Sequence, residues 1–195
     1  DPLPAAASCE VVTADPPLEL PVDPMIRAEA ASIEAELDHA WASYAIGRYT
    51  AASTQASALA QRVARLALPA LQASVLLLGG TIEARIGDGA RARKLLEEAA
   101  VQAARANAPE LELAVWTRLL RQELFAGRPD RVIELGVIGE ATAVRAGHEG
   151  AEILGLIGEA QRTTNKLDGA KLNLTRALAS KDGLREDQRA ILEMN

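Results

Sequence analysis

The chain repeats itself at a regular interval. Four short segments share one pattern: GRYTAA begins at Gly47, GDGARA at Gly87, GRPDRV at Gly127 and NKLDGA at Asn165, so that the first three turns are equally spaced and the fourth comes two positions early. A nearly fixed period of this length indicates an array of stacked supersecondary units, in which each unit contacts only its neighbours. This repeat constrains the fold more than any other feature of the 195-residue sequence.

Each repeated segment has the residues of a tight turn between two helices. It begins with Gly or Asn, which tolerate the left-handed conformation that ends a helix. The stretches between the turns carry apolar residues three and four positions apart, as amphipathic helices do. Pro69 and Pro109 are separated by the same interval as Gly47 and Gly87, and both suit the first turn of a new helix. Each unit is therefore predicted to be a helix, a turn and a second helix.

A compact residue follows each turn residue at the fifth position. We expect this residue to let the second helix approach the first closely, because a small side chain there leaves room for the neighbouring backbone. Arg93, which follows one of these residues, is expected on the surface. The four compact residues are Ala52, Ala92, Val132 and Ala170.

The composition favours an all-α fold without a membrane span. Apolar residues make up 49% of the chain but aromatic residues only 3%, which suits close-packed helices better than a sheet. The most apolar window, 66–82, contains Pro69, Gln72 and two glycines and is predicted to be a buried helix. The net charge of −6 argues against a nucleic-acid partner. The single Cys9 excludes an internal disulfide.

The sequence predicts two regions. Residues 1–25 contain six prolines and form a proline-rich tether, and residues 26–195 form the repeat array, with turns near Gly47, Gly87, Gly127 and Asn165. A further helix is expected after residue 183, because apolar residues return at helical spacing: Leu184, Ala190, Ile191 and Met194. Its partner is missing, so we expect an array truncated at its C-terminus, whose last helix frays or mediates self-association.

These segments resemble the tetratricopeptide (TPR) family. GRYTAA is similar to the family's G-x-Y-x-x-A turn, and Trp116 stands at the bulky position of the first helix, where Leu76 and Leu154 are its equivalents. The sequence departs from the pattern at Glu36, and again at Gly136 and Gly139, where larger residues are usual. The resemblance implies an all-α, right-handed superhelical array of about four TPR-like antiparallel hairpins with a period of 38–40, followed by the start of a further helix.

A second resemblance concerns the order of segments. A proline-rich stretch with Cys9 is followed by residues 24–37, IGRYTAA, QRVARLALPAL and GRPDRVIELG, which is similar to the region after the kinase domain of large bacterial serine/threonine kinases. This chain has no glycine-rich loop on a strand, no H-R-D and no D-F-G. The resemblance implies a place either in the bacterial cytoplasm or on the extracytoplasmic side of a membrane-anchored parent.

The candidates for chemistry favour packing over catalysis. The stretch GDGARARK from Gly87 reads G-x-G-x-x-A, but a dinucleotide site needs a preceding strand, and the same turn recurs in the other repeats. His39 and His148 lack further ligands at metal-binding spacing. The carboxylate pairs 34/36 and 97/98 suit solvated helix faces. We therefore expect no catalytic residue, no cofactor and no metal in this chain.

The remaining candidate is a surface. In the resembled family the first helices of the hairpins line a concave groove that holds a peptide or protein partner, and matching the pattern places these residues in it: Trp41, Thr81, Thr117, Arg118, Arg121, Glu159 and Arg162. In the alternative reading, Trp41 is a core residue and the arginines only solubilise the face. The family's carboxylate clamp is missing, because Leu37 and Trp41 occupy its first-helix positions.

We thus expect a non-enzymatic protein-interaction or sensory region of a larger protein. Two other functions stay open: a helical regulatory domain of a transcriptional activator, and a small-molecule-binding helical domain that uses the turn at residues 87–94.

Overall fold

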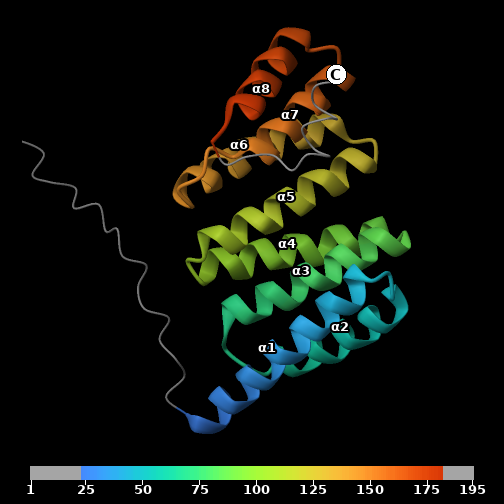
Figure 1. Ribbon diagram of the computed structural model, residues 1–195, viewed down its shortest axis with the longest axis vertical. Coiled ribbons are helices and arrows are strands. Elements are labelled where there is room, and N and C mark those ends of the chain that lie inside the picture. Colours follow the sequence, from blue (N-terminus) through green and yellow to red (C-terminus); the bar gives the residue numbers. More distant parts are fainter. Residues whose placement is uncertain (1–22, 182–195) are drawn as a thin grey trace, which may run out of the picture.

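The computed structural model describes residues 23–181, and in that range the chain is all-helical, with eight helices and no strand (Figure 1). This confirms the predicted all-α class. The helices are α1 (Pro24–Ala45), α2 (Tyr49–Val63), α3 (Pro69–Ile86), α4 (Gly89–Arg105), α5 (Pro109–Phe125), α6 (Pro129–Arg145), α7 (Ala151–Thr163) and α8 (Leu167–Ala179).

The N-terminal boundary differs slightly from the predicted one. Helix α1 begins at Pro24, so the last two residues of the predicted tether belong to the array. Asp23 caps this helix, because its carboxylate accepts a hydrogen bond of 2.8 Å from the Met25 N–H. Cys9, the rest of the tether, the helix expected after residue 183 and its self-association lie outside the described residues.

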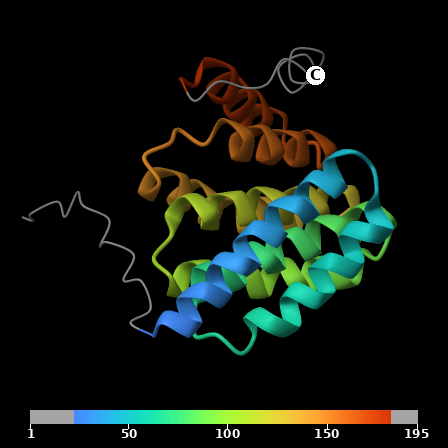
Figure 2. The same cartoon turned by 60° about the horizontal axis from the view of Figure 1, so that its bottom comes forward.

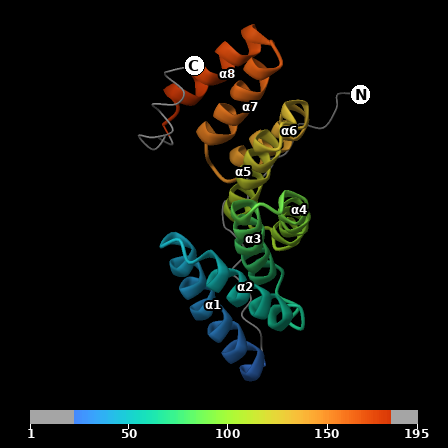
Figure 3. The ribbon, with the colours of Figure 1, turned by 90° about the vertical axis from the view of Figure 1, so that its right-hand side faces the viewer.

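The helices form four antiparallel pairs that stack in chain order. The pairs are α1/α2, α3/α4, α5/α6 and α7/α8, and each second helix also contacts the first helix of the next pair. The turns within the pairs all lie on the right in Figure 1, and the connections between pairs lie on the left. Figure 2 brings α1 and α2 to the front, and Figure 3 shows the succession of pairs from α1 at the bottom to α8 at the top.

The four predicted turn residues close the first helix of each pair. Gly47, Gly87, Gly127 and Asn165 have φ values of 80°, 103°, 70° and 58°, which is the left-handed conformation. The residue after the turn residue then donates its N–H back into the helix: the Arg128 N–H, for example, lies 3.0 Å from the Glu123 carbonyl oxygen. The sequence prediction of left-handed turns is therefore confirmed at all four positions.

The compact residues lie where the two helices of each pair meet. Ala52, Ala92 and Val132 are completely buried, and Ala170 is nearly so. Arg93 is only partly on the surface, because its side chain is 36% exposed. Its Nε lies 2.8 Å from the carboxylate of Glu123, whose side chain is only 2% exposed. Arg93 is thus part of the contact between α4 and α5.

In the second and fourth pairs, glycine and leucine face each other where the two helices cross. A Cβ on Gly80 would lie 2.7 Å from Leu96 Cγ, and a Cβ on Gly158 would lie 2.7 Å from Leu174 Cγ. Both glycines are on the first helix and both leucines on the second, so each glycine provides the space that its leucine fills.

The third pair reverses this arrangement. One repeat after Gly80, Leu120 stands at the equivalent position on α5, and one repeat after Leu96, Gly136 stands at the equivalent position on α6. A Cβ on Gly136 would lie 2.6 Å from Ile157 Cγ1, and one on Gly139 would lie 3.1 Å from Ile153 Cδ1. The two glycines that depart from the family pattern therefore make room for side chains of α7.

A buried carboxylate connects the second and third pairs. Glu123 on α5 binds Arg93 of α4 and also Arg128 at the start of α6, whose Nη2 lies 3.1 Å from Glu123 Oε1. The contacts of Arg128 are charge-assisted hydrogen bonds, which are stronger than neutral ones, and that of Arg93 is an ion pair. The hydrogen bond to Glu123 also raises the pKa of Arg128 above its ordinary value.

The most apolar predicted segment forms α3, whose side chains are largely buried between neighbouring helices. Among the helices of residues 23–181, none is both long enough and apolar enough to cross a membrane.

Candidate functional site

The predicted binding residues lie on the first helices of the four pairs. Because α1 contacts α3, α3 contacts α5 and α5 contacts α7, these helices form one continuous row. We call the surface formed by the seven predicted residues the first-helix face. Its members are Trp41 on α1, Thr81 on α3, Thr117, Arg118 and Arg121 on α5, and Glu159 and Arg162 on α7.

Trp41 is partly packed and partly accessible. It is half-buried and packs against the core of the first pair and against a second cluster that includes Val115 and Leu119 of α5. Its ring meets Tyr44 edge to face, with 5.8 Å between the centroids. The tryptophan therefore contributes to packing between the first two pairs while part of its ring stays accessible.

Thr81 offers little to a partner. The residue is buried, and its hydroxyl donates a hydrogen bond of 2.7 Å to the Leu77 carbonyl in its own helix. Thr117, on the next first helix, is half-buried. Of the two predicted threonines, Thr117 is therefore the one that stays partly accessible.

The charged residues of the first-helix face differ in their partners. Arg121 forms an ion pair with Glu152 of α7, and Arg162 pairs with Glu159 of its own helix at 2.6 Å. The hydrogen bond to Glu159 raises the pKa of Arg162. Arg118 is half-buried and has no hydrogen bond or ion pair with any residue between 23 and 181. Among the residues that the structure describes, Arg118 is thus the one of the three predicted arginines whose guanidinium has no partner.

The segment GDGARARK lies in a helical hairpin. Helix α3 precedes it, Gly87 ends that helix, and the Asp88 carboxylate caps α4 by accepting a hydrogen bond of 2.9 Å from the Arg91 N–H. His39 lies on α1 and His148 in the connection between α6 and α7, and both are exposed. Within residues 23–181, no three His, Cys, Asp or Glu side chains are grouped so that they could hold a metal ion.

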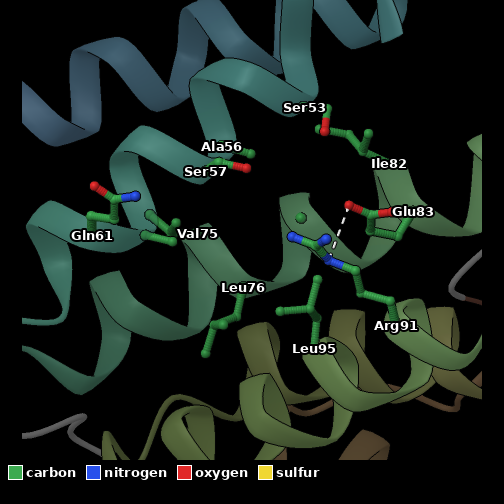
Figure 4. Close-up of a pocket in the computed structure, with 12 residues that line it drawn as sticks. Ser53, Ala56, Ser57, Gln61, Val75, Leu76, Ile82, Glu83, Arg91 and Leu95 are labelled. Atoms are coloured by element: carbon green, nitrogen blue, oxygen red, sulfur yellow. Dashed lines mark ion pairs between the residues drawn. The ribbon is translucent and has the colours of Figure 1, made fainter. Parts of the chain in front are cut away.

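A hollow on another side of the array has no counterpart among the predicted residues. A cavity of about 210 Å³ lies between α2 and α4, above α3 (Figure 4). We call it the α2–α4 crevice. Helix α2 lines it with Ser53, Ser57 and Gln61, α3 with Val75, Leu76, Gly79 and Glu83, and α4 with Arg91 and Leu95, together with smaller contributions from Ala56, Ala60 and Ile82.

The sequence does contain a signal for the α2–α4 crevice, but the signal appears only when the repeats are compared with one another. One repeat after Ser53, Ser57 and Gly79, the equivalent positions hold Arg93, Glu97 and Leu119, and each is larger than its counterpart. Leu119 is almost fully buried, and Arg93 reaches Glu123 on α5. Between the first two pairs, the small residues Ser53 and Gly79 leave the crevice open. Between the second and third pairs, Arg93 and Leu119 at the equivalent positions fill the space.

Comparisons with known proteins bear on the fold alone. The sequence matches no family model, and a search of curated proteins gave no significant match. Among solved structures, the chain is similar to the crystal structure of BtubC (BKLC) from P. vanneervenii, with a TM-score of 0.63 and 17% identity. The likeness covers 85% of this chain and 77% of that chain. The chain is thus an all-helical, repeat-like array whose fold is similar to that of BtubC.

Proposed function

We propose that this chain is a TPR-like protein-interaction region without enzymatic activity, and that it binds a peptide segment of its partner along the first-helix face. The observation that carries the proposal is Arg118. A guanidinium that is half-buried without a partner keeps its hydrogen-bonding capacity for a ligand. Trp41 packs against the cluster that includes Leu119, the residue next to Arg118 on α5. Its ring supplies an aromatic anchor of the kind that is common in interfaces.

These residues suggest what the partner segment contains. An acidic side chain or a terminal carboxylate suits Arg118, because the planar guanidinium donates two parallel hydrogen bonds to a carboxylate. An apolar side chain suits the accessible part of Trp41. We propose that the bound segment combines one carboxylate with one apolar residue nearby. We further propose that the parent protein is a bacterial serine/threonine kinase; this rests on the order of sequence segments, and the complete gene would test it.

A displayed library of random peptides tests the binding site directly. The immobilised full chain should enrich peptides that carry an acidic residue close to an apolar one, and Arg118→Glu should weaken their binding at least about tenfold, because it places two like charges together. The matched control is Val144→Glu, a charge introduced at a side chain that is 74% exposed on α6. Arg118 is a cleaner probe than Trp41 or Arg121, since those two also hold the pairs together.

Circular dichroism should show the same helicity for both variants. If Arg118→Glu keeps full binding, or if both variants lose it equally, the partner binds elsewhere on the array.

A further inference from the structure

We propose that the α2–α4 crevice binds a small aliphatic carboxylate, held by Arg91 at its charged end and by α3 and α4 along its hydrocarbon body. This site is separate from the first-helix face, and the inference does not depend on the proposed function.

The crevice has one polar wall. Ser53, Ser57 and Gln61 occupy every fourth position of α2, so they share one face of that helix. Their side chains have no hydrogen-bond partner among residues 23–181. Two hydroxyls and an amide are therefore available to a ligand in the crevice.

Arg91 supplies the charged group. Its Nε lies 3.3 Å from Oε1 of Glu83, whose side chain is 9% exposed, while the Arg91 side chain itself is 59% exposed. In Figure 4 the guanidinium extends into the crevice, toward the wall formed by α2. The buried carboxylate fixes the Nε side of the guanidinium, and the Nη1 and Nη2 groups have no partner within the described part of the chain. Two parallel N–H donors of this kind match the two oxygens of a carboxylate.

The rest of the crevice is apolar. Val75 and Leu76 of α3 and Leu95 of α4 line it, and Gly79 contributes no side chain. A dry cavity of about 150 Å³ accommodates benzene. The crevice, at about 210 Å³, can therefore hold a branched acid of about five or six carbons.

Two kinds of ligand carry such a carboxylate, a free acid and an α-amino acid, and they differ in net charge. Glu83 already neutralises Arg91, so a free acid adds one net negative charge to a crevice that is open to solvent. An α-amino acid with the same hydrocarbon body adds no net charge, since its ammonium group can approach Glu83. Titrations with 4-methylpentanoate and with leucine distinguish these sources, and 4-methylpentanamide tests whether the carboxylate is needed at all.

Isothermal titration calorimetry on the full chain tests the site. We expect saturable binding of 4-methylpentanoate or leucine with a Kd of roughly 1 mM, as suits a ligand of so few atoms, and binding of the amide at least about tenfold weaker. Arg91→Gln should weaken binding of the carboxylate by at least about tenfold. The matched control is Arg131→Gln, because Arg131 stands at the equivalent position of the next repeat and pairs with Glu134 at the surface, so this variant should bind like the wild type.

A second variant tests the crevice independently of Arg91. Ser53→Arg introduces the residue that stands at the equivalent position of the next repeat, Arg93. The larger side chain should fill the crevice and abolish ligand binding while the helicity stays unchanged. Absence of saturable binding to the wild type would overturn the proposal, and so would full binding to Arg91→Gln or to Ser53→Arg. Equal affinity for the amide would show that Arg91 does not recognise a carboxylate.

Discussion

Gly79 and Gly80 are neighbours on α3, yet they lie in different surroundings. A Cβ on Gly80 would lie 2.7 Å from Leu96 Cγ and 3.2 Å from the Ala92 carbonyl oxygen, so the two helices would have to separate. A Cβ on Gly79 would meet only Leu95 Cδ1, at 3.4 Å, which is an ordinary contact. The same substitution at these two positions therefore has opposite consequences.

We predict that Gly80→Ala lowers the free energy of unfolding by about 1–3 kcal/mol, because it overpacks the crossing of α3 and α4. Gly79→Ala should raise it by up to about 1 kcal/mol, since alanine is the better helix former and the space for its methyl group exists. Urea denaturation of the two variants measures both changes. Shifts of the same sign would mean that α3 and α4 do not approach each other as closely at Gly80 as its contacts indicate.

Residue-level detail was only partly predictable from the sequence. The turn residues and the compact residues could be predicted, because each repeats a local requirement at a fixed spacing. The ion pair of Arg93 could not, since Arg93 is not among the buried residues of its helix, which are Ala92, Leu96, Ala99, Ala100 and Ala103. Its partner, Glu123, belongs to the next repeat and lies far from it in the sequence. The accessibility of Arg118 and the engagement of Arg121 likewise depend on neighbouring helices.

At the scale of the elements, one arginine holds the first two helices together. Arg62 of α2 binds Glu29 through Nε at 2.8 Å and Glu36 through Nη1 at 2.6 Å, and both carboxylates lie on α1. The Arg62 hydrogen bond is the main cause that lowers the pKa of each of these glutamates below its ordinary value of 4.5. Glu36, a departure from the family pattern in the sequence, thus takes part in the contact between the two helices.

These lowered pKa values predict how stability depends on pH. A carboxyl group whose pKa is lower in the folded state stabilises that state fully above its unfolded pKa and loses this contribution as the pH falls through the folded pKa. We therefore expect the melting temperature to fall as the pH is lowered below 4.5. Arg62→Gln should reduce this dependence. Both groups are exposed, so the change should be small and should weaken further in high salt.

Thermal melts between about pH 3 and pH 7 provide the measurement, with Arg131→Gln as a control that removes a pair within a single helix. An equally steep acid dependence for Arg62→Gln and wild type would show that other carboxylates dominate it.

The elements themselves were predictable because helices and turns follow from local patterns. The α2–α4 crevice was not, because its volume depends on side chains from three helices taken together. None of Ser53, Gly79 and Arg91 is unusual in its own helix. The signal appears only when Ser53, Ser57 and Gly79 are compared with their larger counterparts in the next repeat, which are Arg93, Glu97 and Leu119.

At the scale of the whole molecule, contacts between neighbouring pairs hold the array together. Stacked repeats unfold as one unit only while these contacts are strong enough to couple them. Glu123 on α5 joins the second and third pairs by charge, because it binds Arg93 on α4 as well as Arg128, which directly precedes α6. It is also nearly fully buried, at 1% exposure.

We predict that Glu123→Gln lowers the free energy of unfolding by about 1–3 kcal/mol. The loss should stay below the roughly 3–5 kcal/mol typical of a broken buried pair, since both arginines are partly exposed and can turn to water. In hydrogen exchange, α1–α4 should then lose protection at a different denaturant concentration from α5–α8. Glu134→Gln, which removes a surface pair, should change the stability by less than about 1 kcal/mol. A single unfolding transition at the wild-type midpoint would show that Glu123 does not couple the second and third pairs.

The reversal of glycine and leucine between the pairs restricts how such an array can change by recombination. A crossover placed in the turn of a hairpin would combine α5 with α4, where Leu120 would meet Leu96, or α3 with α6, where Gly80 would face Gly136 and leave a void. A crossover placed between hairpins keeps Gly80 with Leu96 and Gly158 with Leu174, but one placed between α6 and α7 separates Gly136 from Ile157. The second hairpin can therefore be exchanged as a whole, whereas the third and fourth hairpins have to be exchanged together, because side chains of α7 occupy the space at Gly136 and Gly139.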